Sequence, residues 1–167
     1  PWYWQTHRAL PAAARCNKMS RTGLWDSHAH LDSDYFTDDR DELIAKIGEE
    51  MEGFINPGCD EASSAFAVQL AEKYDFVYAA VGWHPEELAG IKDEHYLDKL
   101  AAWAVHPKVA AIGEIGLDYY WKENEPKEVQ KKRLLEQIDL AVQFDLPVII
   151  HDREAHGDIF DIFRSGV

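Results

Sequence analysis

The chain has 167 residues, of which 46% are hydrophobic and 29% are charged, and these proportions are typical of one globular domain. No stretch approaches the roughly 20 consecutive apolar residues of a membrane-spanning helix, so an integral membrane protein is not expected. The formal net charge of −14 argues against binding to nucleic acid through a broad basic surface, because such surfaces are rich in lysine and arginine. A metal site would supply positive charge locally.

From Gly23 onward, short apolar runs alternate with helical patterns. A continuous run of apolar and β-branched residues predicts a buried strand, whereas apolar residues three or four positions apart predict a helix. The predicted strands, in chain order, are Leu24–His28, Phe54–Asn56, Phe76–Gly82, Val109–Gly113 and Pro147–Ile150. The predicted helices are Asp38–Met51, Asp60–Tyr74, Glu94–Val105, Pro126–Phe144 and Gly157–Phe163.

Alternation of strand and helix predicts an α/β fold with a parallel sheet. The sequence has no glycine-rich dinucleotide-binding fingerprint, which favours a TIM-type (β/α) barrel over a Rossmann sheet. A complete barrel has eight strands in about 250 residues. We therefore expect an incomplete barrel over residues 23–167, made of about the first five βα units of eight. Residues 1–22 are expected to be a disordered or spurious N-terminal extension.

The two cysteines, Cys16 and Cys59, are too few for a disulfide framework and do not form a Cys-x-x-Cys metal-binding spacing. We expect both thiols to be inert and the protein to be cytoplasmic.

Histidines and one glutamate recur where the predicted strands end. His28 and His30 follow the first strand and point to the same side, because side-chain direction repeats every two residues in a strand. His84 follows the third strand, Glu114 the fourth and His151 the fifth. The carboxyl ends of the strands form the active-site face of barrel enzymes, and imidazoles with a carboxylate suit divalent metals. An isolated His-x-His pair, in contrast, is often only two surface histidines.

Four segments together resemble the TatD family of metal-dependent deoxyribonucleases, which belongs to the amidohydrolase-like barrels. The segments are Leu24–Asp32 (LWDSHAHLD), Val81–Pro85 (VGWHP), Gly113–Tyr119 (GEIGLDY) and Leu146–Ala155 (LPVIIHDREA). The resemblance covers Gly23 to about Val167 in uninterrupted order and implies the N-terminal part of such a barrel.

The resemblance implies a role for each matching residue. His28 and His30 match the pair that binds one metal, His151 matches a ligand of a second metal, and Glu114 matches the catalytic carboxylate that bridges the two. The implied cofactors are two divalent ions, magnesium, manganese or zinc, and the implied reaction is hydrolysis of DNA phosphodiester bonds from a free 3′ end. The family pattern also has a histidine after strand six and an aspartate after strand eight, which lie beyond this sequence.

Two further residues have two interpretations each, and a third has one. His84 could bind a substrate phosphate or pack against its loop. Arg153 could bind a phosphate with both ends of its guanidinium, or pair with Glu154 or Asp158. Asp118 could orient a ligand imidazole.

Two further questions concern the aromatic residues and the reaction. The aromatic residues of the loops could stack on bases or pack in the core or rim, and these are Trp83, Tyr119, Tyr120 and Trp121.

The reaction also has alternatives. A metal site with the same ligands could hydrolyse an amide or ester instead of DNA, or the chain could be an inactive fragment that at most binds metal. We expect a monomer.

Overall fold

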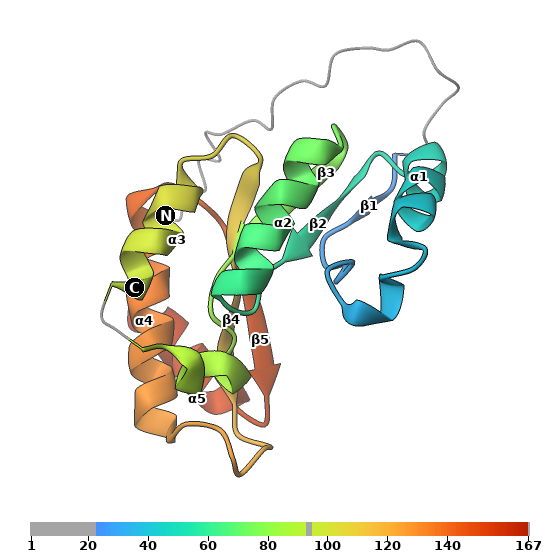
Figure 1. The fold of residues 1–167 in the computed structure, drawn as a ribbon. Coiled ribbons are helices and arrows are strands. Elements are labelled where there is room, and N and C mark those ends of the chain that lie inside the picture. The colour runs from blue at the N-terminus through green and yellow to red at the C-terminus, as the bar shows by residue number, and fades with distance from the viewer. Residues whose placement is uncertain (1–22, 93–94, 167) are drawn as a thin grey trace.

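Five parallel strands form one sheet in the computed structural model, which describes residues 23–92 and 95–166. The strands are β1 (Trp25–Asp26), β2 (Gly53–Pro57), β3 (Val77–Val81), β4 (Val109–Asp118) and β5 (Val148–Arg153). They lie side by side in the order β1-β2-β3-β4-β5 (Figure 1). The prediction of an α/β fold with the first five βα units of an incomplete TIM-type barrel is confirmed. The extension predicted over residues 1–22, with Cys16, lies outside the described residues.

Four helices connect successive strands and a fifth follows β5, and α2, α3 and α4 lie along one side of the sheet (Figure 1). The helices are α1 (Arg40–Glu50), α2 (Glu61–Lys73), α3 (Tyr96–Ala104), α4 (Lys127–Gln143) and α5 (His156–Arg164). Their ends differ from the predicted ends by one or two residues, and all five were predicted. Two short 3-10 helices, η1 (Asp34–Phe36) and η2 (Pro85–Gly90), were not predicted.

The hydrophobic core lies between the sheet and these helices. Its fully enclosed side chains include Ile44, Phe54, Val77, Leu100 and Ile112, and burying each stabilises the fold by roughly 1.5–3 kcal/mol. Leu135 and Val142 of α4, although apolar, are exposed. Each residue turns a helix by about 100°, and the buried side of α4 holds Gln130, Leu134, Gln137, Ile138, Leu140 and Ala141.

Three strands, β1, β4 and β5, differ most from the prediction. β1 has only two residues and both are exposed, so the strand predicted over Leu24–His28 is present but is shorter than predicted and is not buried. β4 and β5 instead continue further than predicted. Their pairing extends through Gly116 with His151 to Asp118 with Arg153. Glu114 and His151 therefore project from inside strands, at a place where one face of the sheet becomes polar.

Candidate metal centre

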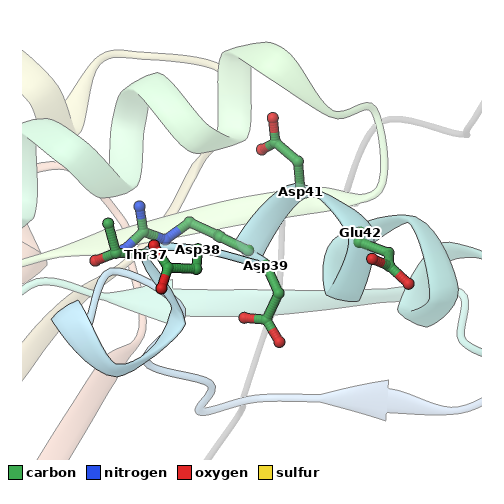
Figure 2. Close-up of a pocket in the computed structure, with 6 residues that line it drawn as sticks. Thr37, Asp38, Asp39, Asp41 and Glu42 are labelled. Carbon is green, nitrogen blue, oxygen red and sulfur yellow. The ribbon is translucent and has the colours of Figure 1, made fainter.

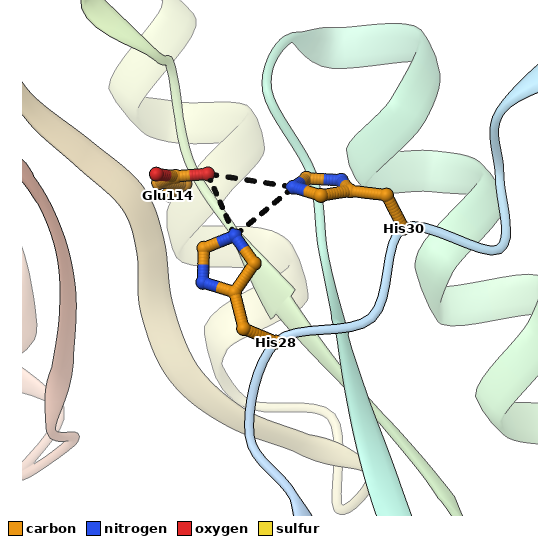
Figure 3. A group of neighbouring side chains, drawn as sticks. All are labelled: His28, His30 and Glu114. Carbon is orange, nitrogen blue, oxygen red and sulfur yellow. Dashed lines mark hydrogen bonds and ion pairs between the residues drawn. The ribbon is translucent and has the colours of Figure 1, made fainter.

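His28 and His30, which follow β1, and Glu114, from within β4, converge on one point (Figure 3). The Nε2 atom of His28 lies 3.0 Å from Oε2 of Glu114, and the Nε2 atom of His30 lies 3.4 Å from the same oxygen. The two Nε2 atoms are 3.0 Å apart. Because β1 and β4 are not neighbours in the sheet, these three side chains meet from elements that do not pair with each other.

These separations fit a bound divalent ion. Imidazole nitrogens and carboxylate oxygens bind zinc at about 2.0–2.2 Å, which puts two ligand atoms roughly 3.0–3.5 Å from each other. The three pairs are separated by 3.0, 3.0 and 3.4 Å. At these separations the imidazole nitrogens can donate an N–H to the carboxylate, or all three atoms can act together as ligands of one cation.

The other oxygen of Glu114 faces a second pair of histidines. Oε1 lies 3.2 Å from Nδ1 of His151 and 3.9 Å from Nε2 of His84. The rings of His84 and His151 are in contact, with centroids 4.2 Å apart. The carboxylate of Glu114 thus has one oxygen directed at each of two histidine clusters, an arrangement that lets a single carboxylate bridge two ions.

The hydrogen bonds of His84 distinguish it from the other three histidines. Its Nδ1 accepts the backbone N–H of Glu86 at 3.2 Å, so in the neutral ring Nε2 carries the proton and is a donor. Burial lowers the pKa of His84 to about 4, which keeps the ring neutral. An N–H group pointing into the centre suits an oxyanion of a substrate and does not suit a metal ion.

Asp118 fixes the orientation of His151. Its Oδ2 lies 2.9 Å from Nε2 of His151, so an N–H at Nε2 leaves Nδ1 free for an ion beside Glu114. The carboxyl group of Asp118 is fully enclosed. Glu86, Asp118 and His151 are also close enough to hold a cation. However, this third arrangement needs Nε2 of His151 as a ligand, and it therefore competes with the hydrogen bond that orients the ring.

His30 has a similar support, which the sequence did not reveal. Its Nδ1 faces Oδ1 of Asp32 at 3.5 Å, and that oxygen accepts a hydrogen bond from Nδ2 of Asn56 at 3.0 Å. The Oδ1 atom of Asn56 in turn accepts the N–H of Leu31 at 2.7 Å. Asn56 is completely buried. The signal in the sequence was a polar side chain at the end of an apolar strand, the same signal that marks the histidines.

The electrostatics of the cluster are those of an anionic site surrounded by imidazoles. Burial alone would raise the pKa of Glu114, but hydrogen bonds with His151 and His30 outweigh it and hold that pKa far below its usual range. Hydrogen bonds with Asp32 and Glu114 raise the pKa of His30 to about 9. Burial lowers the pKa of His151, yet its bonds to Glu114 and Asp118 raise it overall. Each shift favours positive charge next to Glu114.

Arg153 lies at the rim and does not pair with either predicted acid. Asp158 is occupied by Lys131, 2.9 Å away, and by the hydroxyl of Tyr119. The guanidinium of Arg153 instead lies over the ring of Tyr120, 4.3 Å from its centroid. The four aromatic residues that could stack on bases differ in exposure. Trp83 is buried and Tyr119 is half-buried, whereas Tyr120 and Trp121 are exposed.

A hollow at the start of α1 is separate from this centre (Figure 2). Arg40 lines it together with Thr37 and four acidic residues, Asp38, Asp39, Asp41 and Glu42. The guanidinium of Arg40 is turned to the carbonyl oxygens of Leu31, Asp32 and Ser33. The exposed carboxylates would repel an anionic substrate, so we assign no site there.

The remaining predictions on cysteine and membranes have simple outcomes. Cys59 is a free thiol, and burial raises its pKa to about 12, which makes the thiolate scarce at neutral pH. Within the described residues, no helix combines the length and the apolar character that a membrane crossing requires.

Comparison with known proteins gives one consistent family. The model of TatD-related DNases matches residues 25–166. The "uncharacterized metal-dependent hydrolase YabD" of Bacillus subtilis is 40% identical over 85% of this chain and 55% of its own length. The "3'-5' ssDNA/RNA exonuclease TatD" of Musicola paradisiaca is 33% identical over 84% of this chain and 53% of its own.

A solved structure agrees with these matches. The crystal structure of YJJV, a TatD homologue from Escherichia coli K12, has a TM-score of 0.71 at 34% identity and covers 80% of this chain and 52% of that one. The chain thus spans about half the length of the relatives it matches. With this match over nearly all of its described residues, the chain belongs to the TatD-related DNase family of metal-dependent hydrolases.

Proposed function

We propose that this protein hydrolyses phosphodiester bonds of single-stranded nucleic acid, DNA above all, with two divalent ions held at Glu114. The observation that carries the proposal is the carboxylate of Glu114, whose two oxygens face separate histidine clusters. The name of the Musicola paradisiaca relative, a 3'-5' ssDNA/RNA exonuclease, supports this choice of substrate and of a free 3′ end.

Each ion would have its own ligands from this chain. His28, His30 and Glu114 would hold the first, and Glu114 and His151 the second, with magnesium, manganese or zinc as candidates. Bound divalent ions polarise a phosphoryl oxygen, lower the pKa of water and offset the charge on the leaving oxygen. Asp32 and Asp118 would keep the lone pairs of His30 and His151 directed at the ions.

Two residues would bind the substrate phosphate. The Nε2–H of His84 points into the centre and would donate to a phosphoryl oxygen. Arg153, two residues after His151, would add a charged pair of N–H donors from the rim. An N–H donor and a guanidinium at this place favour a phosphodiester over an uncharged amide or ester, the alternative that the metal ligands alone leave open.

The test is metal-dependent hydrolysis by the intact protein. A single-stranded oligonucleotide labelled at its 5′ end should shorten progressively from the 3′ end with manganese, magnesium or zinc present. EDTA and Glu114→Ala should each abolish shortening, whereas Glu154→Ala, a nearby surface carboxylate, should leave it intact. Hydrolysis that survives both EDTA and Glu114→Ala would refute the mechanism, and faster turnover of p-nitrophenyl esters or anilides would support the amide or ester alternative. Calorimetry with manganese shows whether the chain at most binds metal.

A further inference from the structure

Tyr120, Trp121 and Arg153 form an aromatic platform beside the metal centre. The rings of Tyr120 and Trp121 meet edge to face with centroids 4.7 Å apart. The guanidinium carbon of Arg153 lies 4.3 Å from the centroid of Tyr120 and 5.3 Å from that of Trp121. Tyr120 is 47% exposed and Trp121 is 41% exposed. Large aromatic surface that stays in contact with water has area available for a ligand.

The platform is attached to the metal centre through one side chain. Oδ1 of Asp118 accepts the backbone N–H groups of Tyr120 at 3.0 Å and Trp121 at 3.3 Å. Oδ2 of the same carboxylate faces His151 at 2.9 Å. In addition, the N–H of Tyr119 donates to the carbonyl oxygen of Arg153 at 2.9 Å. The platform and the ligand His151 are therefore held in a fixed relation by the pairing of β4 with β5.

The charges of the platform and of the whole chain indicate the ligand. Within the part of the chain that the structure describes, no carboxylate lies within ion-pair distance of Arg153, whose cation–π contacts hold it in place. The chain carries a formal charge of −14, so it has little general attraction for a phosphate backbone. Aromatic stacking supplies affinity that does not depend on charge, and every nucleobase presents a face for it.

We propose that this platform binds an unpaired nucleobase next to the scissile phosphate. Trp121 and Tyr120 stack against the base, and Arg153 contacts the phosphate of that nucleotide. The proposal rests on the proposed function, because it names the part of the substrate that lies outside the metal centre. It restricts the substrate to single strands, since a base in a duplex keeps its faces stacked on its neighbours. Stacking is worth roughly 5- to 150-fold in affinity per base.

The experiment compares two substitutions on two substrates, using the intact, metal-loaded protein. Trp121→Leu removes the stacking face, and Trp25→Leu is the matched control, because Trp25 is 44% exposed and lies in β1 at the opposite ends of the strands. The substrates are a single-stranded oligonucleotide and the same strand with abasic residues beside the cleaved bond. We expect Trp121→Leu to raise KM about tenfold on the first substrate and not on the second, with kcat little changed. Trp121→Phe should restore most of the affinity.

Equal loss on both substrates, or an unchanged KM on the first, would overturn the platform. A misfolded fraction lowers kcat and leaves KM unaltered, so it does not mimic the expected result. Fluorescence anisotropy of the labelled strands separates this proposal from the function. If base-bearing strands bind more tightly than abasic ones only when Trp121 is present, the platform stands even without turnover. If they bind equally to the unmodified protein, the platform fails even when hydrolysis is observed.

Discussion

Glu114 shows how one side chain can be both buried and ionised. It is 7% exposed, and an isolated carboxylate at that depth would take up a proton. His28, His30 and His151 surround it within 3.0 to 3.4 Å and keep it charged. The orientation of these imidazoles depends in turn on the residues that hydrogen-bond to their other ring nitrogens. Substitutions two contacts away from Glu114 should therefore affect metal binding.

Asn56 is the clearest case of such a distant effect. Asn56→Leu leaves the buried N–H of Leu31 without its acceptor and frees Asp32. We expect a loss of about 1–3 kcal/mol in the free energy of unfolding and 10- to 100-fold weaker metal binding at the proposed first site. Urea denaturation and manganese titration measure the two effects. Gln143→Leu, an exposed amide of α4, is the control, and equal behaviour of both variants would exclude a role for Asn56 in the site.

His30 should make the stability of the metal-free protein depend on pH. Its pKa is raised from 6.5 to about 9 by Asp32 first and Glu114 second, so the folded state binds the proton more tightly than the unfolded state. This stabilisation is fully present below about pH 6.5 and is lost as the pH rises through about 9. Melting temperatures of the wild type and His30→Gln, in EDTA from pH 5.5 to 10, should therefore differ most at the acidic end. A difference that grows toward pH 10 would contradict the assignment.

At the scale of elements, the continued pairing of β4 with β5 positions half of the centre. Gly116 pairs with His151 and has a φ of 157°. A Cβ atom at this position would lie 1.9 Å from the carbonyl oxygen of His151. The two strands can approach this closely only where one of them has no side chain. This explains the glycine at position 116, midway between Glu114 and Asp118.

Gly116→Ala should therefore damage both the fold and the proposed second metal site. The clash is with backbone atoms and cannot be relieved by a rotamer change. We therefore expect a destabilisation of about 1–3 kcal/mol. Metal binding at His151 should weaken more than metal binding at His28 and His30. Gly157→Ala is the control, because no atom lies within 4 Å of its Cβ position and alanine is favoured over glycine in a helix by about 1 kcal/mol. Urea denaturation and metal titration of both variants check this, and a neutral Gly116→Ala would refute the close approach.

At the scale of the whole molecule, the acidic surface limits how the protein can bind nucleic acid. The 31 acidic residues outnumber the 17 lysines and arginines, so few phosphates can be neutralised by side chains. We expect the affinity for single strands to fall only slightly with salt, with a slope of log K against log salt of about −1 to −2. Proteins with many phosphate contacts have much steeper slopes. Anisotropy titrations between 50 and 200 mM KCl measure the slope, and a value near −6 would show an extended basic contact.

The sequence by itself determined the order of elements and the parallel sheet, and it indicated which residues are candidate ligands. Periodicity predicted all five helices, because burial of one helix face imposes a spacing of three to four residues. The candidate ligands were found as polar residues that follow apolar runs, and they are His28, His30, Glu114 and His151. This pattern is informative because parallel strands bring their carboxyl ends to one edge of the sheet. These signals are local, so they can be found without coordinates.

Only the tertiary structure decided what lies around these residues. The extension of β4 and β5, the support of His30 by Asp32 and Asn56, and the Arg153 platform all depend on residues far apart in the chain. The orientation of His84 depends on one backbone N–H, that of Glu86. No periodic pattern encodes such contacts, since they follow from the curvature of the sheet and from where each buried polar group finds a partner.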